Sequence, residues 1–108
     1  MYNENLAARV RKILFPIISA DEKKMFGGIG FLVNGNMAVG VYKDDLIARI
    51  GTENHNTALK AKGAKPFDIT GKPMAGWIMV SPEGCATDKA LGKWISMAVE
   101  FVKTLPPK

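Results

Sequence analysis

The sequence has few of the residues on which common covalent and metal chemistries depend. Its 108 residues include one cysteine, Cys85, and one histidine, His55. A single cysteine excludes a disulfide within the chain and fits a reducing compartment. A single histidine without neighbouring cysteines does not make a metal site of ordinary composition. We therefore predict no metal site, no cofactor and a cytoplasmic protein.

Long apolar segments and a signal sequence are also missing. No apolar run approaches the ~18 residues that suggest a membrane-spanning helix. Residues 1–5 have neither the basic region nor the apolar region of a signal peptide. We therefore expect the chain to act without a membrane.

What the chain does contain is typical of one globular domain. Hydrophobic residues make up 47% and charged residues 23%, so disorder is expected only at the ends, such as residues 105–108. The length predicts a single domain over residues 1–108. The 15 Lys and Arg against 10 Asp and Glu give a formal net charge of +5. This charge permits weak attraction to nucleic acid without establishing it.

The N-terminal segment has the periodicity of an amphipathic helix. Apolar residues fall on one face of residues 4–18, and Asn3 or Asn5 can cap the first turn. Because Pro16 cannot continue the hydrogen-bond ladder, the regular helix should end or kink near Phe15. The predicted buried face consists of Leu6, Val10, Ile13, Leu14 and Ile17.

The middle of the chain predicts an antiparallel meander of short β-rich runs. The connections between these runs are too short for anything but antiparallel neighbours. Asn34-Gly35 is a strong hairpin signal, because Asn and Gly both accept positive φ. An edge strand is expected just before the glycines. The predicted strands, from this edge strand onward, are residues 22–26, 29–33, 37–42 and 46–50.

The C-terminal half predicts two helices around one strand. The helices span residues 53–62 and 88–104, and the strand spans residues 77–81, after a long loop over residues 63–76. The resulting order is α-β-β-β(-β)-α-β-α. This order predicts an α+β domain, with two layers in which an antiparallel sheet has its helices on one face. The expected capping residues of the two helices are Thr52 and Thr87.

Three glycines, Gly27, Gly28 and Gly30, crowd the start of the meander. A phosphate-binding loop needs GxGxxG or Gly-Lys-Ser/Thr, and it leads into a helix. This run lacks the third glycine of that pattern, and a β-rich segment follows it. We therefore interpret the glycines as a β-bulge or a tight bend between strands, where glycine permits unusual backbone angles.

Three short motifs stand in order along the chain: MFGG, the NGNMAVGV hairpin and GKPM. In this order and spacing they resemble the TfoX N-terminal domain family. The resemblance covers the chain from the first predicted helix to the last. The motif residues, which we expect to be structural, are Met25, Phe26, Gly27, Gly28, Gly35, Gly71, Pro73 and Met74.

The resemblance implies a fold similar to that of type III secretion chaperones, and it supplies no catalytic residues. TfoX, also called Sxy, regulates DNA-uptake competence in bacteria. Such full regulators carry a second, C-terminal helical domain linked to their role beside the cAMP receptor protein at promoters. The present chain ends at Lys108, so it resembles a stand-alone N-terminal domain. A link to competence or transcription is an expectation that comes from the resemblance.

The isolated polar residues do not predict a catalytic constellation. Cys85 stands just before the last predicted helix, whose N-terminus could lower the thiol pKa, but an inert, partly buried cysteine is the simpler interpretation. We interpret His55 as a solvated surface residue. Asp44 and Asp45 are interpreted as solvated turn residues, because general acid–base catalysis needs carboxylates that converge on a cleft. We therefore predict a protein that is not an enzyme.

Basic residues provide the alternative function. Lys60, Lys62, Lys65 and Lys72 cluster in the second predicted helix and the loop after it. Nucleic-acid binding requires several such charges on one surface, although a solvated face is the simpler interpretation of a charge run. The chain has no helix-turn-helix signature and no interleaved aromatic residues. The alternative is therefore a weak nucleic-acid-binding accessory factor in transcription.

The strands themselves indicate a protein partner. Residues 37–41 are apolar at nearly every position, so neither face of this strand is suited to water. Either both faces of the sheet are covered within the chain, or another chain covers one of them. We therefore predict a domain that acts through protein–protein contacts, either as a homodimer or with a partner of unknown identity.

Overall fold

The computed structural model describes residues 2–25, 27–67 and 74–108, which form one sheet, three α-helices and a short 3₁₀ turn. No helix among these residues is long and apolar enough to cross a membrane. The strands are β1 (Asp21–Met25), β2 (Gly28–Val33), β3 (Asn36–Tyr42), β4 (Asp45–Arg49), β5 (Ala64–Pro66) and β6 (Trp77–Val80). The helices are α1 (Glu4–Leu14), α2 (Thr52–Leu59) and α3 (Asp88–Val102), and the 3₁₀ turn η1 is Pro82–Gly84.

The sheet is open and antiparallel throughout, with the spatial order β1-β2-β3-β4-β6-β5. The first four strands form a meander, because each is joined to the next by a short turn. β6 then pairs with β4, and β5 occupies the far edge. The α+β class and the predicted order of helices and strands are therefore confirmed, with β5 as an additional short strand.

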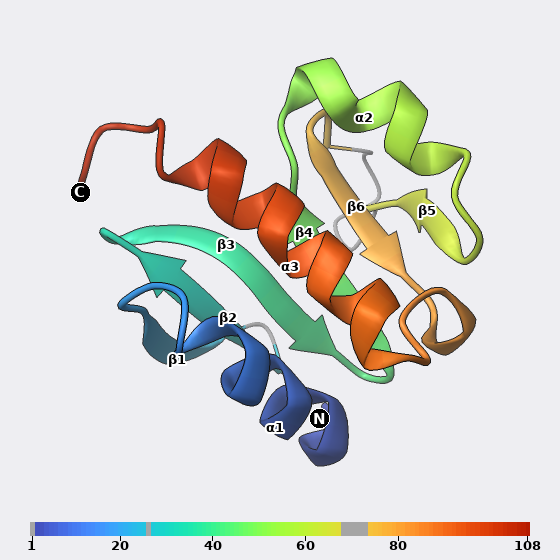
Figure 1. Ribbon diagram of the computed structural model, residues 1–108, viewed down its shortest axis with the longest axis horizontal. Coiled ribbons are helices and arrows are strands. Elements are labelled where there is room, and N and C mark those ends of the chain that lie inside the picture. The colour runs from blue at the N-terminus through green and yellow to red at the C-terminus, as the bar shows by residue number, and fades with distance from the viewer. Residues whose placement is uncertain (1, 26, 68–73) are drawn as a thin grey trace.

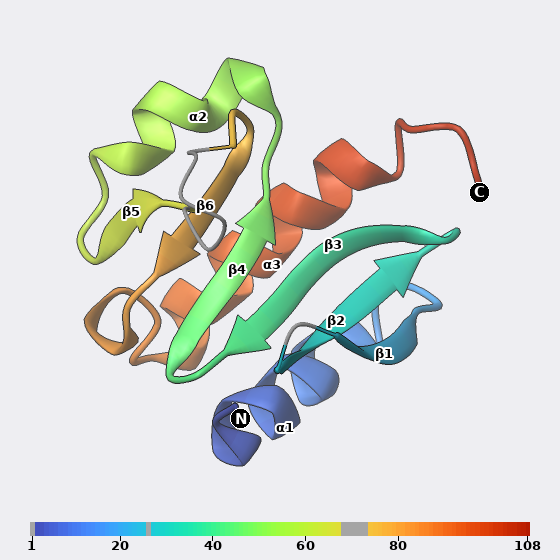
Figure 2. The same ribbon diagram turned by 180° about the vertical axis from the view of Figure 1, so that it is seen from behind.

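Helices α1 and α3 pack side by side on one face of the sheet (Figure 1). α3 crosses β3 and β4, whereas α2 packs against β5 and β6. Thr87 caps α3 as predicted, because its hydroxyl accepts a hydrogen bond from the Ala90 amide at 3.1 Å. Seen from behind, β2, β3 and β4 have no helix over them (Figure 2). The sheet therefore has one face that helices cover and one face that they leave uncovered.

The hydrophobic core fills the space between the sheet and the helices. Phe31 on β2 is its largest fully buried side chain. Alternate residues of β2, β3 and β4 supply the sheet side of this core. The apolar stripe predicted for the last helix supplies much of the helix side, through Leu91, Trp94, Ile95, Ala98 and Val102.

The first helix begins and ends where local chemistry requires. The Asn3 side-chain oxygen accepts a hydrogen bond from the Leu6 amide at 3.0 Å. Because Pro16 cannot continue the helix, α1 ends at Leu14. Ile17, which we predicted on the buried face, lies beyond this end and is 55% exposed.

The glycines at the start of the meander form a tight turn between β1 and β2. Met25 pairs with Gly28, so only two residues connect these strands. Gly27 has a φ of 77°, a conformation in which a side chain is strained. The register shift between β2 and β3 lies further along, after Phe31. The tight-bend interpretation is confirmed, while the motif residue Phe26 lies outside the described residues.

Two local features differ from the predictions. Residues 64–66, predicted as loop, form the edge strand β5, where Pro66 is tolerated because an edge strand need not use every amide. Gly51 rather than Thr52 occupies the N-cap of α2, with a φ of 86° and no side-chain hydrogen bond. Thr52 is instead the first helical residue, and the helix ends at Leu59.

The C-terminal tail, for which we predicted disorder, packs against the β2–β3 hairpin. The Lys108 amide donates a hydrogen bond to the Asn34 carbonyl at 2.8 Å. The side chain of Asn36, which is 3% exposed, donates to the Pro106 carbonyl at 3.0 Å. A buried amide needs such a partner, so the tail satisfies a polar group of the hairpin.

Candidate functional site

The uncovered face of the sheet contains an apolar hollow of about 300 Å³. Alternation along β4 places it there, because Leu46 and Ala48 enter the core while Ile47 points to the opposite face and lines the hollow. Side chains from β1, β3, β4 and β6 and from the flanks of the connection before β6 surround it. Its principal side chains are Met25, Met37, Ile47, Phe67, Met74 and Trp77.

Paired glycines lie beneath two of the methionines that line this hollow. Gly30 and Gly40 stand opposite each other on β2 and β3, so neither contributes a side chain to the uncovered face. Methionines pack over them instead: a Cβ on Gly30 would lie 3.1 Å from the Met25 Cε and 3.4 Å from the Met37 Sδ. The sequence predicted glycines only as bends, and their second role follows from the register of the strands.

Aromatic rings form one wall of the hollow. The rings of Phe67 and Trp77 are stacked, with their centroids 5.7 Å apart and an angle of 29° between their planes. The Arg49 guanidinium carbon lies 5.2 Å from the Trp77 ring centroid and 5.8 Å from that of Phe101. Arg49 therefore holds a positive charge against the aromatic wall.

The Asp45 carboxylate, a second charged group on this face, is neutralised by a lysine of the same chain. The Lys65 Nζ lies 3.0 Å from the Asp45 carboxylate, whose side chain is only 17% exposed. The neighbouring Asp44 accepts a hydrogen bond from the Asn3 side chain at 3.1 Å. We predicted Asp44 and Asp45 as solvated turn residues. This is wrong for Asp45, because Lys65, twenty positions later in the sequence, binds its carboxylate.

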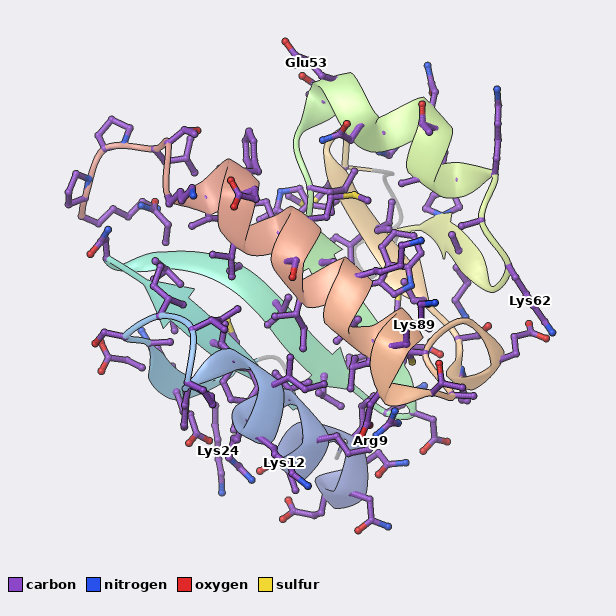
Figure 3. The ribbon with its side chains drawn as sticks, in the orientation of Figure 1. Arg9, Lys12, Lys24, Glu53, Lys62 and Lys89 are labelled. Carbon is purple, nitrogen blue, oxygen red and sulfur yellow. The ribbon has the colours of Figure 1, made fainter. Side chains whose placement is uncertain are left out.

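Of the lysines proposed for nucleic-acid binding, one has a carboxylate partner within the chain. Lys65 is bound to Asp45, whereas Lys60 and Lys62 are exposed at the end of α2 and after it. Figure 3 shows Lys62 at one side of the molecule, far from Lys12 and Lys24. The fourth member, Lys72, lies outside the described residues.

Cys85 is buried, with 1% of its surface exposed. Its thiol donates a weak hydrogen bond to the Ser81 carbonyl at 3.6 Å. Burial raises the pKa of the Cys85 thiol, and this effect outweighs the opposing influence of the nearby positive charge of Arg9. The structure therefore supports the interpretation of Cys85 as an inert cysteine rather than a poised thiolate.

The raised pKa predicts how Cys85 responds to a thiol reagent. DTNB should label the folded protein at least about a hundredfold more slowly than the urea-unfolded chain, because labelling requires opening of the buried site. The labelling rate should still rise above pH ~8.5, the ordinary thiol value. Burial also makes this thiol a source of stability below its ordinary pKa, and that stability is lost as the pH rises through the folded-state value. Fast labelling with a plateau below pH 8.5 would contradict this expectation.

Arg9 connects the first helix to the start of the last. Its guanidinium donates to the Cys85 carbonyl at 3.0 Å and to the Ala86 carbonyl at 3.3 Å. It also pairs with the Asp88 carboxylate at 3.2 Å. Figure 3 shows Arg9 extending from α1 toward this corner. Arg9 therefore performs a structural task, and Asp88 is one of its partners.

His55 is not the solvated surface residue that we predicted. Its Nδ1 accepts a hydrogen bond from the Gly76 amide at 3.2 Å, so it joins α2 to the start of β6. Among residues 2–25, 27–67 and 74–108, no three His, Cys, Asp or Glu side chains are grouped as metal ligands would be. The polar residues with long-range partners described above thus serve packing and turn geometry.

The family-motif residues fall into two groups in the structure. Met25, Gly28 and Met74 line the hollow. Gly35 has a φ of 84° in the β2–β3 turn, where the hairpin was predicted, and Gly27 forms the β1–β2 turn described above. The remaining motif residues, Phe26, Gly71 and Pro73, lie outside the described residues.

The fold and the hollow together define a small α+β domain with one covered and one uncovered sheet face. The family model of the TfoX N-terminal domain matches residues 13–102 of this chain. Because the match spans most of the sequence, the chain belongs to the TfoX N-terminal domain family, as its motifs indicated. No curated protein sequence matches the chain.

Proposed function

We propose that this domain acts by binding another protein through the uncovered face of its sheet. The observation that carries the proposal is the apolar hollow on that face. Apolar surface gathered around a cavity is typical of binding sites, where a few buried side chains provide most of the binding energy. Three of its lining residues, Met25, Met37 and Met74, are methionines, whose flexible side chains adapt to the shape of a partner.

A role without catalysis is part of the same proposal. General acid–base and nucleophilic catalysis need ionisable groups that face a substrate site. Here Asp45 is paired with Lys65, and Cys85 is buried. The hollow itself is lined almost entirely by apolar side chains, which can bind but do not transfer protons.

Membership of the TfoX N-terminal domain family supports a proposal for the cellular process that this binding serves. We propose that the domain acts in the cytoplasm as an adaptor linked to the regulation of competence or transcription. Contact with a protein partner, rather than with DNA directly, would then provide the regulatory effect.

Weak nucleic-acid binding is the second candidate function. Its support is the net charge of +5 and the exposure of Lys60 and Lys62. Phosphate contacts make affinity fall steeply with salt, so a salt titration of DNA binding separates the two candidates. The Lys60→Gln, Lys62→Gln double variant should bind DNA more weakly and with a smaller salt dependence, if this candidate holds.

A pair of variants tests the protein-binding proposal. Met37→Glu places a charge in the hollow, whereas Ser96→Glu adds the same charge at an exposed position on α3. We expect Met37→Glu to weaken binding at least about a hundredfold, because burying an unpaired carboxylate is costly. Ser96→Glu should bind as the wild type does. The measurements are affinity capture from the native cell and analytical ultracentrifugation, with circular dichroism to verify folding.

Two results would contradict the proposal. One is a wild-type protein that is strictly monomeric and captures no partner. The other is a partner or a dimer that Met37→Glu retains and Ser96→Glu loses, since this would place the interface on the helix side of the sheet.

A further inference from the structure

Arg49 occupies a particular place at the edge of the hollow. Arg49 is two residues after Ile47 on β4, so the two side chains point to the same face of the sheet. Arg49 also pairs with Trp77 on β6, so all three residues belong to the uncovered face. Its guanidinium carbon is 5.2 Å from the Trp77 ring centroid and 5.8 Å from that of Phe101. Trp77 lines the cavity, whereas Phe101 belongs to α3 on the other side of the sheet, so the Arg49 charge lies next to the cavity through its contact with Trp77.

The charge of Arg49 has no partner of opposite sign within the described part of the chain. Asp45, the carboxylate on the same strand and face, is bound to Lys65 at 3.0 Å. Within residues 2–25, 27–67 and 74–108, no carboxylate makes an ion pair with Arg49. A guanidinium that stacks on a ring keeps N–H donors at its edge, and these suit a carboxylate.

We infer that the hollow binds a peptide segment that combines a bulky apolar residue with an acidic one. The apolar side chain enters the cavity between Met37, Ile47 and Trp77. An Asp or Glu of the same segment accepts hydrogen bonds from the Arg49 guanidinium at the edge. This inference rests on the proposed function of the face, and it adds the chemistry by which a partner is recognised.

The size of the hollow suits such a segment. Its volume of about 300 Å³ is at the lower end of the roughly 300–1,000 Å³ typical of ligand pockets. One or two large side chains fill a space of this size, so the remainder of the segment must lie over the edge, where Arg49 is. Apolar filling and a charged edge contact are the usual division between the core and the rim of an interface.

Selection from a random-peptide display library tests the inference. Peptides that bind the wild type should contain an aromatic or large aliphatic residue near an Asp or Glu. Arg49→Gln should weaken their binding about tenfold, the typical effect of one charged hydrogen bond. Arg49→Lys should restore part of the loss. Lys12→Gln, which removes one charge from an exposed position on α1, is the matched control and should have no effect on peptide binding.

A double-mutant cycle makes the assignment specific. Replacing the acidic residue of a selected peptide by its amide should weaken wild-type binding about as much as Arg49→Gln does. The same peptide change should then have little effect on the Arg49→Gln variant. Binding is measured by titration calorimetry, and the fluorescence of Trp77 should change on binding because its ring lines the cavity.

Several outcomes overturn the inference. These are a library that enriches no peptide, enriched peptides without acidic residues, and binding that Arg49→Gln leaves unchanged. A dimer that Met37→Glu dissociates would assign the hollow to a second copy, and binding of decanoate without any peptide would assign it to a free amphiphile. A captured partner that depends on Met37 but not on Arg49 leaves the proposed function standing while this inference fails.

Discussion

Replacing Phe31 by alanine should lower the free energy of unfolding by about 3–5 kcal/mol. Phe31 is fully buried on the helix face of β2, where it pairs across the sheet with Val39. Its removal leaves a cavity between the sheet and α1 that neighbouring side chains cannot fill completely. A domain of this size has about 5–15 kcal/mol of stability, so this single change removes a large part of it.

Phe15 provides the matched control for this prediction. Its ring meets that of Phe31 edge-to-face, with centroids 6.2 Å apart, but Phe15 is 42% exposed. Phe15→Ala should therefore cost only about 1 kcal/mol, the sum of a weak aromatic pair and partial burial. Urea denaturation of both variants, followed by circular dichroism, gives the two values. Equal losses would mean that the helix packs on β2 differently from the structure described above.

Local sequence signals were sufficient for most of the fold. Asn34-Gly35 predicted a hairpin, and Gly35 does adopt a positive φ there. Pro16 predicted the end of α1, and Thr87 predicted the start of α3. Each of these signals acts through the backbone within a few residues, so no knowledge of the tertiary structure is needed to interpret it.

Features that depend on distant partners could not be predicted in this way. β5 forms because residues 64–66 meet β6, and its sequence, Ala-Lys-Pro, has low strand propensity on its own. The predicted N-cap Thr52 is displaced by Gly51, which has a φ of 86° and packs against the ring of Phe101, a residue distant in sequence. The tail residue Lys108 is ordered by a hairpin more than seventy positions earlier, at Asn34.

The candidate site likewise combines features that local sequence signals predicted with features that depend on distant partners. An uncovered apolar sheet face was predicted as one of two alternatives, because residues 37–41 are apolar at nearly every position. The hollow in that face was not predicted, since the residues that line it come from strands and a connection that are distant from one another in the sequence. Likewise, Arg49 attracted no attention in the sequence, and only its position between Trp77 and Phe101 identifies it.

The glycines near the start of the meander therefore have distinct tasks. Gly27 permits the β1–β2 turn through its positive φ. Gly30 and Gly40 leave space over the sheet that the side chains of Met25 and Met37 occupy. Gly28 serves a third purpose, because a Cβ at this position would approach the backbone of the neighbouring strand. Substitutions at these positions should consequently have different effects, although all of them are glycines in strands or turns.

Replacing Gly28 by alanine should cost about 3 kcal/mol of stability, the upper range for overpacking. The new Cβ would clash with the Val41 carbonyl oxygen, because it would come closer to this oxygen than such atoms approach in proteins. This oxygen belongs to the backbone of β3, between two paired strands, so it cannot move without breaking the sheet. The measurement is the midpoint of urea denaturation at constant m-value.

Two other glycines make this prediction specific. Gly92 lies inside α3, and apart from the backbone of its own helix and its chain neighbours nothing lies within 4 Å of the Cβ position, so Gly92→Ala should stabilise the protein by about 0.5–1 kcal/mol. At Gly30, the nearest atom is the Met25 Cε at 3.1 Å, the end of a flexible side chain. Gly30→Ala should therefore cost less than about 1 kcal/mol. If Gly28→Ala were as mild as Gly30→Ala, the close approach of β2 and β3 at the motif glycine would be wrong, and Gly28 would need another explanation.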